Sequence, residues 1–152
     1  MNNNPPVRIY CHHFAFPSTA EDENRHVNNI EYVRMLQESA IAHTRQNGWA
    51  PEDLRQQGWT WVVRSHFIEY LRPCQVGEAI ALYTWVADFS KIRSLRKYRF
   101  IRDADGILLA KAQTDWVFLN FHTGRPLAIP PDIRAAYAIV PDSEAEAAST
   151  HV

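Results

Sequence analysis

The residues DENRHVNN, from Asp22 to Asn29, bring together side chains that could carry out acid–base chemistry. Asp22, Asn24 and His26 occupy alternate positions, so all three would point to one side if this stretch is extended. A carboxylate can activate a water molecule or attack a carbonyl carbon itself, and an amide can hold that water or a substrate oxygen. An imidazole can move a proton near neutral pH. Together these groups suit transfer of an acyl group to water.

The same composition has a plainer explanation, because Asp and Asn are common in loops that cap helices. The residues that follow predict a helix from about Asn29 to Asn47, ended by Gly48. The first N–H groups of such a helix stabilise a negative oxygen, so Asn28 and Asn29 are candidates for supporting an oxyanion. From these residues alone, DENRHVNN could be an ordinary helix cap or an active site at the positive end of the helix. The apolar positions at helical spacing are Ile30, Val33, Leu36, Ala40 and Ile41.

Most of the remaining chain has the character of β-strands. A first strand is expected at residues 7–16, and short helical turns are expected at 51–58 and 130–137. Aromatic and β-branched residues then fill four stretches joined by short links, which is typical of an antiparallel meander. These stretches are 59–73, 78–90, 93–103 and 107–121. One early helix and four long strands indicate an α+β fold, with a sheet wrapped around one buried helix.

The chain is expected to form one domain. We predict a flexible leader at residues 1–6, a domain at 7–140 and a mobile polar tail at 141–152. The outer face and the edge of the sheet would invite a partner chain, so a homodimer or homotetramer is expected.

Composition excludes several classes of protein. A net charge near −1 gives no sign of a nucleic-acid partner, and no apolar run is long enough to span a membrane. The absence of a signal-like segment predicts a cytoplasmic protein. Cys11 and Cys74 form neither a zinc spacing nor a disulfide framework, and no metal is expected. The histidines outside the motif lack a ligand spacing; they are His12, His13, His43, His66, His122 and His151.

The string D-E-N-R-H-V-N-N-I-E-Y resembles the D-x-N-x-H-V-N-N-x-x-Y motif of plant-type acyl-ACP thioesterases. It resembles more loosely the D-x-x-G-H-V-N-N segment of the 4-hydroxybenzoyl-CoA thioesterase-like family. The segments MLQESAIAHTRQNG, WVVRSHFIEYLRPCQVGE and WVFLNFHTGRPLAIPPDI are also similar to that family, in the same order, so the likeness covers roughly residues 7–137. It implies the hotdog fold, an antiparallel sheet around one long helix, paired as a dimer.

The resemblance also implies roles for the motif residues. Asp22 would be the carboxylate that activates water or attacks, Asn24 the amide and His26 the imidazole, while Asn28 and Asn29 match the paired asparagines. This chain departs from the family at Arg25, where the wider family has glycine. It departs again in YLRPC, where Pro73 replaces a glutamate of the plant-type enzymes and Cys74 alone is retained.

A basic stretch at residues 91–102 contains six Lys or Arg and no acid. Strand alternation would place Arg93, Lys97 and Arg99 on one face, with Arg96 and Arg102 on the other. These cations suit the phosphates of coenzyme A or the acidic helix of an acyl carrier protein, although a solvated edge strand is an equal alternative. The substrate-binding candidates are Arg93, Arg96, Lys97 and Arg99, with Tyr32, Leu36 and Phe67 expected to line an acyl pocket.

The leading hypothesis is a thioesterase that hydrolyses acyl-CoA or acyl-ACP to a carboxylic acid and a thiol. No separate cofactor is expected, because coenzyme A or phosphopantetheine arrives as part of the substrate. A hotdog hydratase or dehydratase is one alternative, but its D-x-N-P-x-H motif places aspartate and histidine five apart, whereas Asp22 and His26 are four apart. A non-catalytic protein that binds acyl thioesters is the other alternative.

Overall fold

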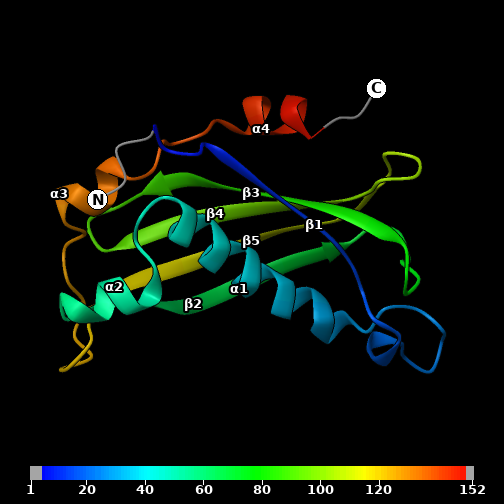
Figure 1. The fold of residues 1–152 in the computed structure, drawn as a ribbon, viewed down its shortest axis with the longest axis horizontal. Coiled ribbons are helices and arrows are strands. Elements are labelled where there is room, and N and C mark those ends of the chain that lie inside the picture. Colours follow the sequence, from blue (N-terminus) through cyan, green and yellow to red (C-terminus); the bar gives the residue numbers. More distant parts are fainter. Residues whose placement is uncertain (1–4, 150–152) are drawn as a thin grey trace.

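The computed structural model describes residues 5–149 and shows one antiparallel sheet with a long helix across one face (Figure 1). The five strands are β1 (Ile9–Ala15), β2 (Trp59–Tyr70), β3 (Ala79–Phe89), β4 (Arg93–Arg102) and β5 (Leu108–Asn120). Their spatial order is β1-β3-β4-β5-β2. The predicted meander is confirmed for β3, β4 and β5, while β2 and β1 form the two edges.

The long helix α1 (Asn29–Gln46) begins and ends where the sequence predicts. The prediction of its apolar face is right for Leu36 and Ala40, which are buried against the inner face of the sheet, and wrong for Ile30 and Ile41, which are exposed. The buried face instead continues through Tyr32, Met35 and the polar residues Ser39, His43 and Thr44. Gly48 follows the helix with a φ of +91°, a conformation that favours glycine. The short helix α2 (Pro51–Gln56) opens at its proline, as expected, because the first helical position needs no N–H donor.

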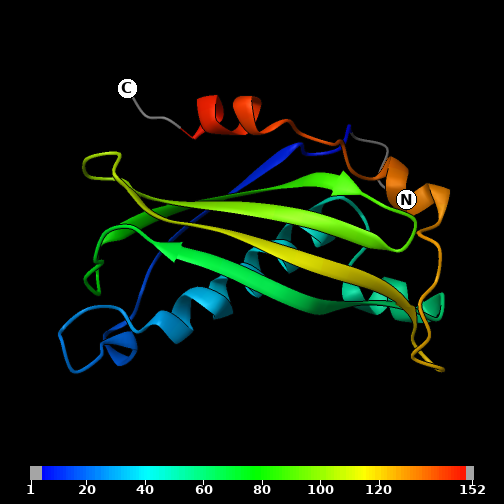
Figure 2. The ribbon, with the colours of Figure 1, turned by 180° about the vertical axis from the view of Figure 1, so that it is seen from behind.

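The alternation of side chains along β4 is confirmed. Ser94, Arg96, Tyr98 and Phe100 are buried on the side of α1, whereas the residues between them are more exposed. Seen from behind, the opposite face of the sheet carries no helix over its centre (Figure 2). We call the α1 side the inner face and the opposite side the outer face.

The C-terminal segment differs from the prediction of a mobile tail. After α3 (Pro131–Ala135), residues Asp142–Ala148 form a helix, α4. Val140 and Ala145 are fully buried against Ala81, Trp85 and other residues of the outer face. The small side chains that suggested mobility instead allow the helix to approach the sheet closely. Residues 1–4 of the predicted leader and 150–152 of the tail lie outside the described residues.

Candidate active site

The motif DENRHVNN folds into a closed turn, so the extended conformation that would place Asp22, Asn24 and His26 on one side is not present. The N–H of Asp22 donates to the carbonyl of His26 at 2.7 Å, and the N–H of Arg25 donates to the carbonyl of Asp22 at 3.1 Å. The Asp22 carboxylate drives this turn, because its Oδ1 accepts the N–H groups of Asn24 at 2.9 Å and His26 at 3.0 Å. The Asp22 carboxylate thus holds the backbone of Asn24 and His26 in the turn.

Arg25 has an unusual backbone conformation within this turn. Its φ is +63°, and it is the one non-glycine residue with positive φ between residues 5 and 149. That conformation costs an ordinary L-residue about 1–2 kcal/mol. The turn is thus held in a strained shape by the hydrogen bonds of Asp22, as is common where a chain positions functional groups.

Surrounding backbone fixes the turn against the rest of the protein. The N–H of Val27 donates to the carbonyl of Cys74 at 2.8 Å, and the N–H of Asn28 donates to the carbonyl of Ala20 at 2.7 Å. The Tyr70 hydroxyl at the end of β2 donates to the carbonyl of Asn29 at 3.2 Å. The turn therefore sits where the start of α1 meets the C-terminal end of β2.

The helix-capping role of the motif is confirmed by Asn28. Its side-chain Oδ1 accepts the N–H of Ile30 at 3.0 Å, and its carbonyl accepts the N–H of Glu31 at 2.9 Å. These bonds satisfy two of the donors that begin α1. Asn29 is exposed as the first helical residue.

The Asp22 carboxylate has one oxygen committed to structure and one available. Oδ1 holds the turn, whereas Oδ2 makes no hydrogen bond to any residue in the described part of the chain. Asn24 is exposed and His26 is half-buried beside it. An anchored carboxylate with a free oxygen can accept a proton from water or attack an electrophilic carbon.

The environment of Cys74 does not favour a reactive thiolate. The residue is buried next to the turn, and its pKa is raised to about 11, first by burial and then by the nearby Glu78. The thiol therefore stays protonated at neutral pH, where only a thiolate would react. Its observed function is packing, and its neighbour Pro73 is exposed.

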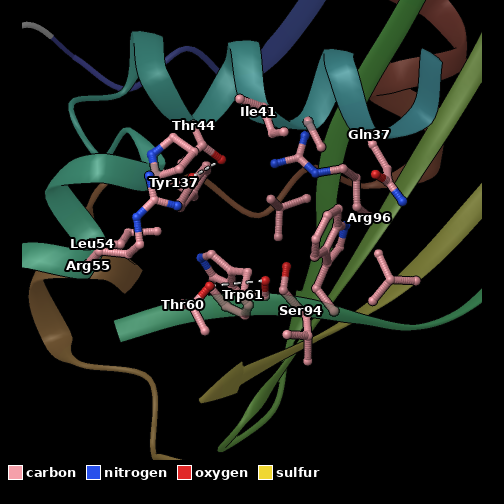
Figure 3. Close-up of a pocket in the computed structure, with 16 residues that line it drawn as sticks. Gln37, Ile41, Thr44, Leu54, Arg55, Thr60, Trp61, Ser94, Arg96 and Tyr137 are labelled. Carbon is pink, nitrogen blue, oxygen red and sulfur yellow. Dashed lines mark hydrogen bonds between the residues drawn. The ribbon is translucent and has the colours of Figure 1, made fainter. Parts of the chain in front are cut away.

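A cavity of about 400 Å³ lies under the other half of α1 (Figure 3). Aromatic and aliphatic side chains dominate its walls, among them Trp61, Val86, Trp116 and Tyr137, and Ile41 of α1 lies over it. Twelve residues of helix separate Asn29 from Ile41, which corresponds to about 18 Å along the axis. Within one chain, the turn and this cavity are therefore at opposite ends of α1.

The predicted substrate-binding residues are distributed over three places. Tyr32 is 3% exposed and packs in the core against Phe16 and Phe100, and it does not line the cavity. Leu36 is also core, and Phe67 lies in a shallow hollow of the outer face.

The basic residues of β4 are divided between the two faces. Arg93 is paired with Asp115 at 3.6 Å and Lys97 with Asp142 at 2.7 Å, and Arg99 lies beside Lys97 in the outer-face hollow. Arg96 instead lines the cavity on the inner face and is 4% exposed. The four residues therefore do not form one surface.

A sequence model of the thioesterase-like superfamily matches residues 17–137, which is most of the chain. The chain belongs to the thioesterase-like superfamily. The resemblance that the motif first indicated is therefore confirmed, together with the α+β hotdog fold that it implies.

Individual members of this superfamily are distant in sequence. A palmitoyl-acyl carrier protein thioesterase of Cuphea hookeriana is 25% identical over 133 residues, covering 83% of this chain and 32% of its own length. The chain thus spans about a third of the curated relatives it matches.

Solved structures show the same fold. The structure of a DHNA-CoA thioesterase from Staphylococcus aureus superposes with a TM-score of 0.78 at 19% identity, covering 86% of this chain and 89% of that one. An acyl-ACP thioesterase from Bacteroides thetaiotaomicron gives 0.71 at 23% identity, covering 80% of this chain and 49% of that one.

The pocket of this thioesterase-like chain was not identified from the sequence. One signal was available, because the alternation in β5 places Thr114, Trp116 and Phe118 on one face, and that face is the inner one.

No helix between residues 5 and 149 has the length and apolar character to cross a membrane. Within the same residues, no group of three or more His, Cys, Asp or Glu is arranged to hold a metal ion.

A buried hydrogen bond joins Arg96, in the cavity wall, to His43 behind it. Nη1 of Arg96 donates to Nδ1 of His43 at 2.9 Å, so the ring proton lies on Nε2, which faces the carbonyl of Val7 at 2.5 Å. The pKa of His43 is lowered to about 3, first by burial and then by the adjacent guanidinium. His43 is therefore neutral at physiological pH.

This buried imidazole predicts an acid-sensitive fold. The free energy of unfolding should fall as the pH drops from 6.5 toward about 3, because the unfolded chain binds a proton on His43 that the folded chain excludes. The contribution of this group approaches about 1.4 kcal/mol per pH unit in that range and vanishes above it. Urea unfolding of wild type and His43→Gln at several pH values measures it, and equal slopes for the two proteins would contradict the prediction.

Proposed function

We propose that this chain hydrolyses an acyl thioester, using Asp22 to activate water or to attack the carbonyl carbon. The observation that carries the proposal is the divided role of its carboxylate, with Oδ1 anchored by two N–H groups and Oδ2 unbonded among the described residues. Membership of the thioesterase-like superfamily supports the same reaction class.

The proposed reaction balances with the groups of the motif. With Asp22 as the base, its carboxylate takes a proton from water while the oxygen forms a bond to the thioester carbonyl carbon. The C–S bond then breaks, and the thiolate leaves with a proton that His26 delivers. Asn24 holds the water or the carbonyl oxygen, and the end of α1 at Asn28 and Asn29 stabilises the developing negative charge.

A second copy of the chain would complete the site. The turn lies at the C-terminal end of β2, whereas Thr60 and Trp61 at its N-terminal end line the cavity. If two β2 edges pair antiparallel about a twofold axis, the turn of one chain comes beside the cavity of the other. A homodimer would therefore place the acyl group in one subunit and the Asp22 carboxylate in the other.

The surface along β2 supports this pairing. β2 is an edge strand, and an edge of this kind leaves backbone groups ready to pair with another strand. Large apolar side chains are exposed on β2 and on the neighbouring side of α1, as expected for a surface that a partner covers. They are Ile30, Ile41, Val62, Phe67, Tyr70 and Leu71.

The outer face of β4 is the proposed contact for the carrier of the acyl group. Arg93, Lys97 and Arg99 are partly accessible there, and phosphates of coenzyme A or acidic side chains of a carrier protein would compete with Asp115 and Asp142 for them. Arg96 is excluded from this role by its burial.

Release of free thiol from a panel of acyl-CoAs and acyl-ACPs tests the proposed function. Turnover of at least one member is expected, and the preferred member identifies the carrier. Loss of the double bond of crotonyl-CoA without thiol release would instead indicate a hydratase. Retention of acyl-CoA by the folded protein without turnover would indicate a binding protein.

A further inference from the structure

Arg96 stands out as a buried cation without a counter-ion. It is 4% exposed, and its hydrogen bonds among the described residues are made by Nη1, to His43 Nδ1 at 2.9 Å and Thr84 Oγ1 at 3.1 Å. Both partners are neutral. No carboxylate in the described part of the chain forms an ion pair with it.

Other cations of the same strand are treated differently. Arg102 is paired with Asp105 at 2.9 Å and Glu78 at 3.3 Å, and Arg93 is paired with Asp115, although all of these lie nearer to solvent. A surface cation needs an acid least, because water screens it, while a buried cation needs one most. Arg99 also lacks an ion pair among the described residues, but it is only half-buried on the outer face. Arg96 is therefore the buried cation of β4, and it is left without an acid, which marks its charge as available for another role.

The surroundings of Arg96 show where its charge is directed. Figure 3 shows its guanidinium in the space between Ile41 of α1 and Ser94 and Trp61 on the strands. His43, which accepts a hydrogen bond from Arg96, cannot neutralise the guanidinium, because an imidazole is either neutral or positively charged. The guanidinium is therefore the single formal charge in the inner wall of a largely apolar cavity, whose other charged lining residue, Arg55, is exposed at the side of α2.

We propose that the cavity takes an acyl group whose far end carries a carboxylate, and that Arg96 is the residue that selects it. This inference rests on the proposed function for the thioester end of the substrate, but not for the anion site itself. The carboxylate would accept hydrogen bonds from the N–H groups on Nε and Nη2 of Arg96, because Nη1 is already bonded to His43 and Thr84. The aromatic walls would cover the carbons between the two ends of the acyl group. An acyl group with a methyl end would leave the buried charge unpaired.

Matched pairs of CoA thioesters test this selection. Mono-CoA thioesters of the straight-chain diacids from four to eight carbons are each compared with the monoacid of equal chain length, and 4-carboxybenzoyl-CoA is compared with 4-methylbenzoyl-CoA. Wild type should favour the carboxylated member of at least one pair by about tenfold or more in kcat/KM, as a charge-assisted hydrogen bond in a buried site requires. The straight-chain and aromatic arms distinguish the two sources of the carboxylate.

Variants assign that preference to Arg96. Arg96→Met should lower kcat/KM for the carboxylated member by about tenfold to a hundredfold and leave the methyl-ended member within about threefold. Arg96→Lys keeps the charge without the planar fork and should retain part of the preference. Arg102→Met, on the same strand but away from the cavity, is the matched control and should keep the wild-type preference.

The outcomes separate this inference from the proposed function. If wild type has the same kcat/KM for every methyl-ended member as for its carboxylated partner, the selection by Arg96 is overturned and the proposed thioesterase activity stands. If no thioester is hydrolysed, the proposed function fails, and thermal shifts with the free monoacids and with their neutral primary amides of equal chain length decide the anion site alone. Stabilisation by an acid but not by its amide supports the site, and equal responses overturn it, even if Arg96→Met does not fold.

Discussion

Replacing Asp22 by asparagine is expected to lower thioester turnover by about a hundredfold to ten-thousandfold while the protein stays folded. The asparagine Oδ1 can still accept the N–H groups of Asn24 and His26, so the turn that begins the site should survive. What disappears is the negative charge and the basicity of the second oxygen. Thiol release under saturating substrate and far-UV circular dichroism measure the two consequences separately.

Asp22→Ala provides the comparison. It removes both turn-closing hydrogen bonds along with the charge, so it should lose the same activity and also about 1–3 kcal/mol of stability. The difference in stability between the two variants reports the structural role of Oδ1, and their shared loss of activity reports the chemical role of the carboxylate. Turnover near the wild-type level in Asp22→Asn would remove Asp22 from the reaction.

Placing two aspartates on β2, as Val62→Asp with Phe67→Asp, is expected to separate the proposed dimer into monomers and to abolish most turnover. Val62 is 39% exposed and Phe67 is 59% exposed, so a single chain should tolerate both changes. In a dimer paired along β2, however, each introduced carboxylate would be buried or would face the same carboxylate of the second chain. Val62 also lines the cavity, so the association state, rather than turnover, decides this prediction. The dissociation constant should rise about a thousandfold, if each position contributes as interface hot spots do.

The matched control places the same two charges on exposed apolar residues away from β2. Ile107→Asp with Ile139→Asp should keep both the dimer and the activity, because Ile107 lies in the connection between β4 and β5 and Ile139 lies between α3 and α4. Light scattering at several protein concentrations gives the association state, and thiol release gives the activity. A fully active monomer would show that one chain contains the whole site, and a wild-type monomer would contradict the dimer directly.

Most helices and strands of this protein could be predicted from local sequence signals, because their ends depend on residues a few positions away. Asn28 and Gly48 mark the two ends of α1, since a side-chain acceptor begins the helix and a positive φ ends it. Pro51 begins α2 for an equally local reason. Strand alternation also placed Arg96 on the opposite face from Arg93, Lys97 and Arg99, which the burial of β4 confirms.

Only the tertiary structure decided how these elements combine into a site. The turn at residues 22–26 depends on the hydrogen bonds of the Asp22 carboxylate and on the positive φ of Arg25, and the alternation of residue types did not reveal it. The C-terminal residues became a helix because the outer face of the sheet offered Ala145 a surface to pack on.

The cavity and its charge are likewise consequences of long-range packing. Arg96 and His43 are 53 residues apart in the chain, and their contact exists because α1 lies over β4. The same basic stretch could equally have placed every cation in solvent, and no local pattern distinguishes a guanidinium that meets water from one that meets an apolar wall. The types and spacing of residues therefore indicated the thioesterase-like superfamily, whereas packing between distant segments placed the charge of Arg96 in the wall of the cavity.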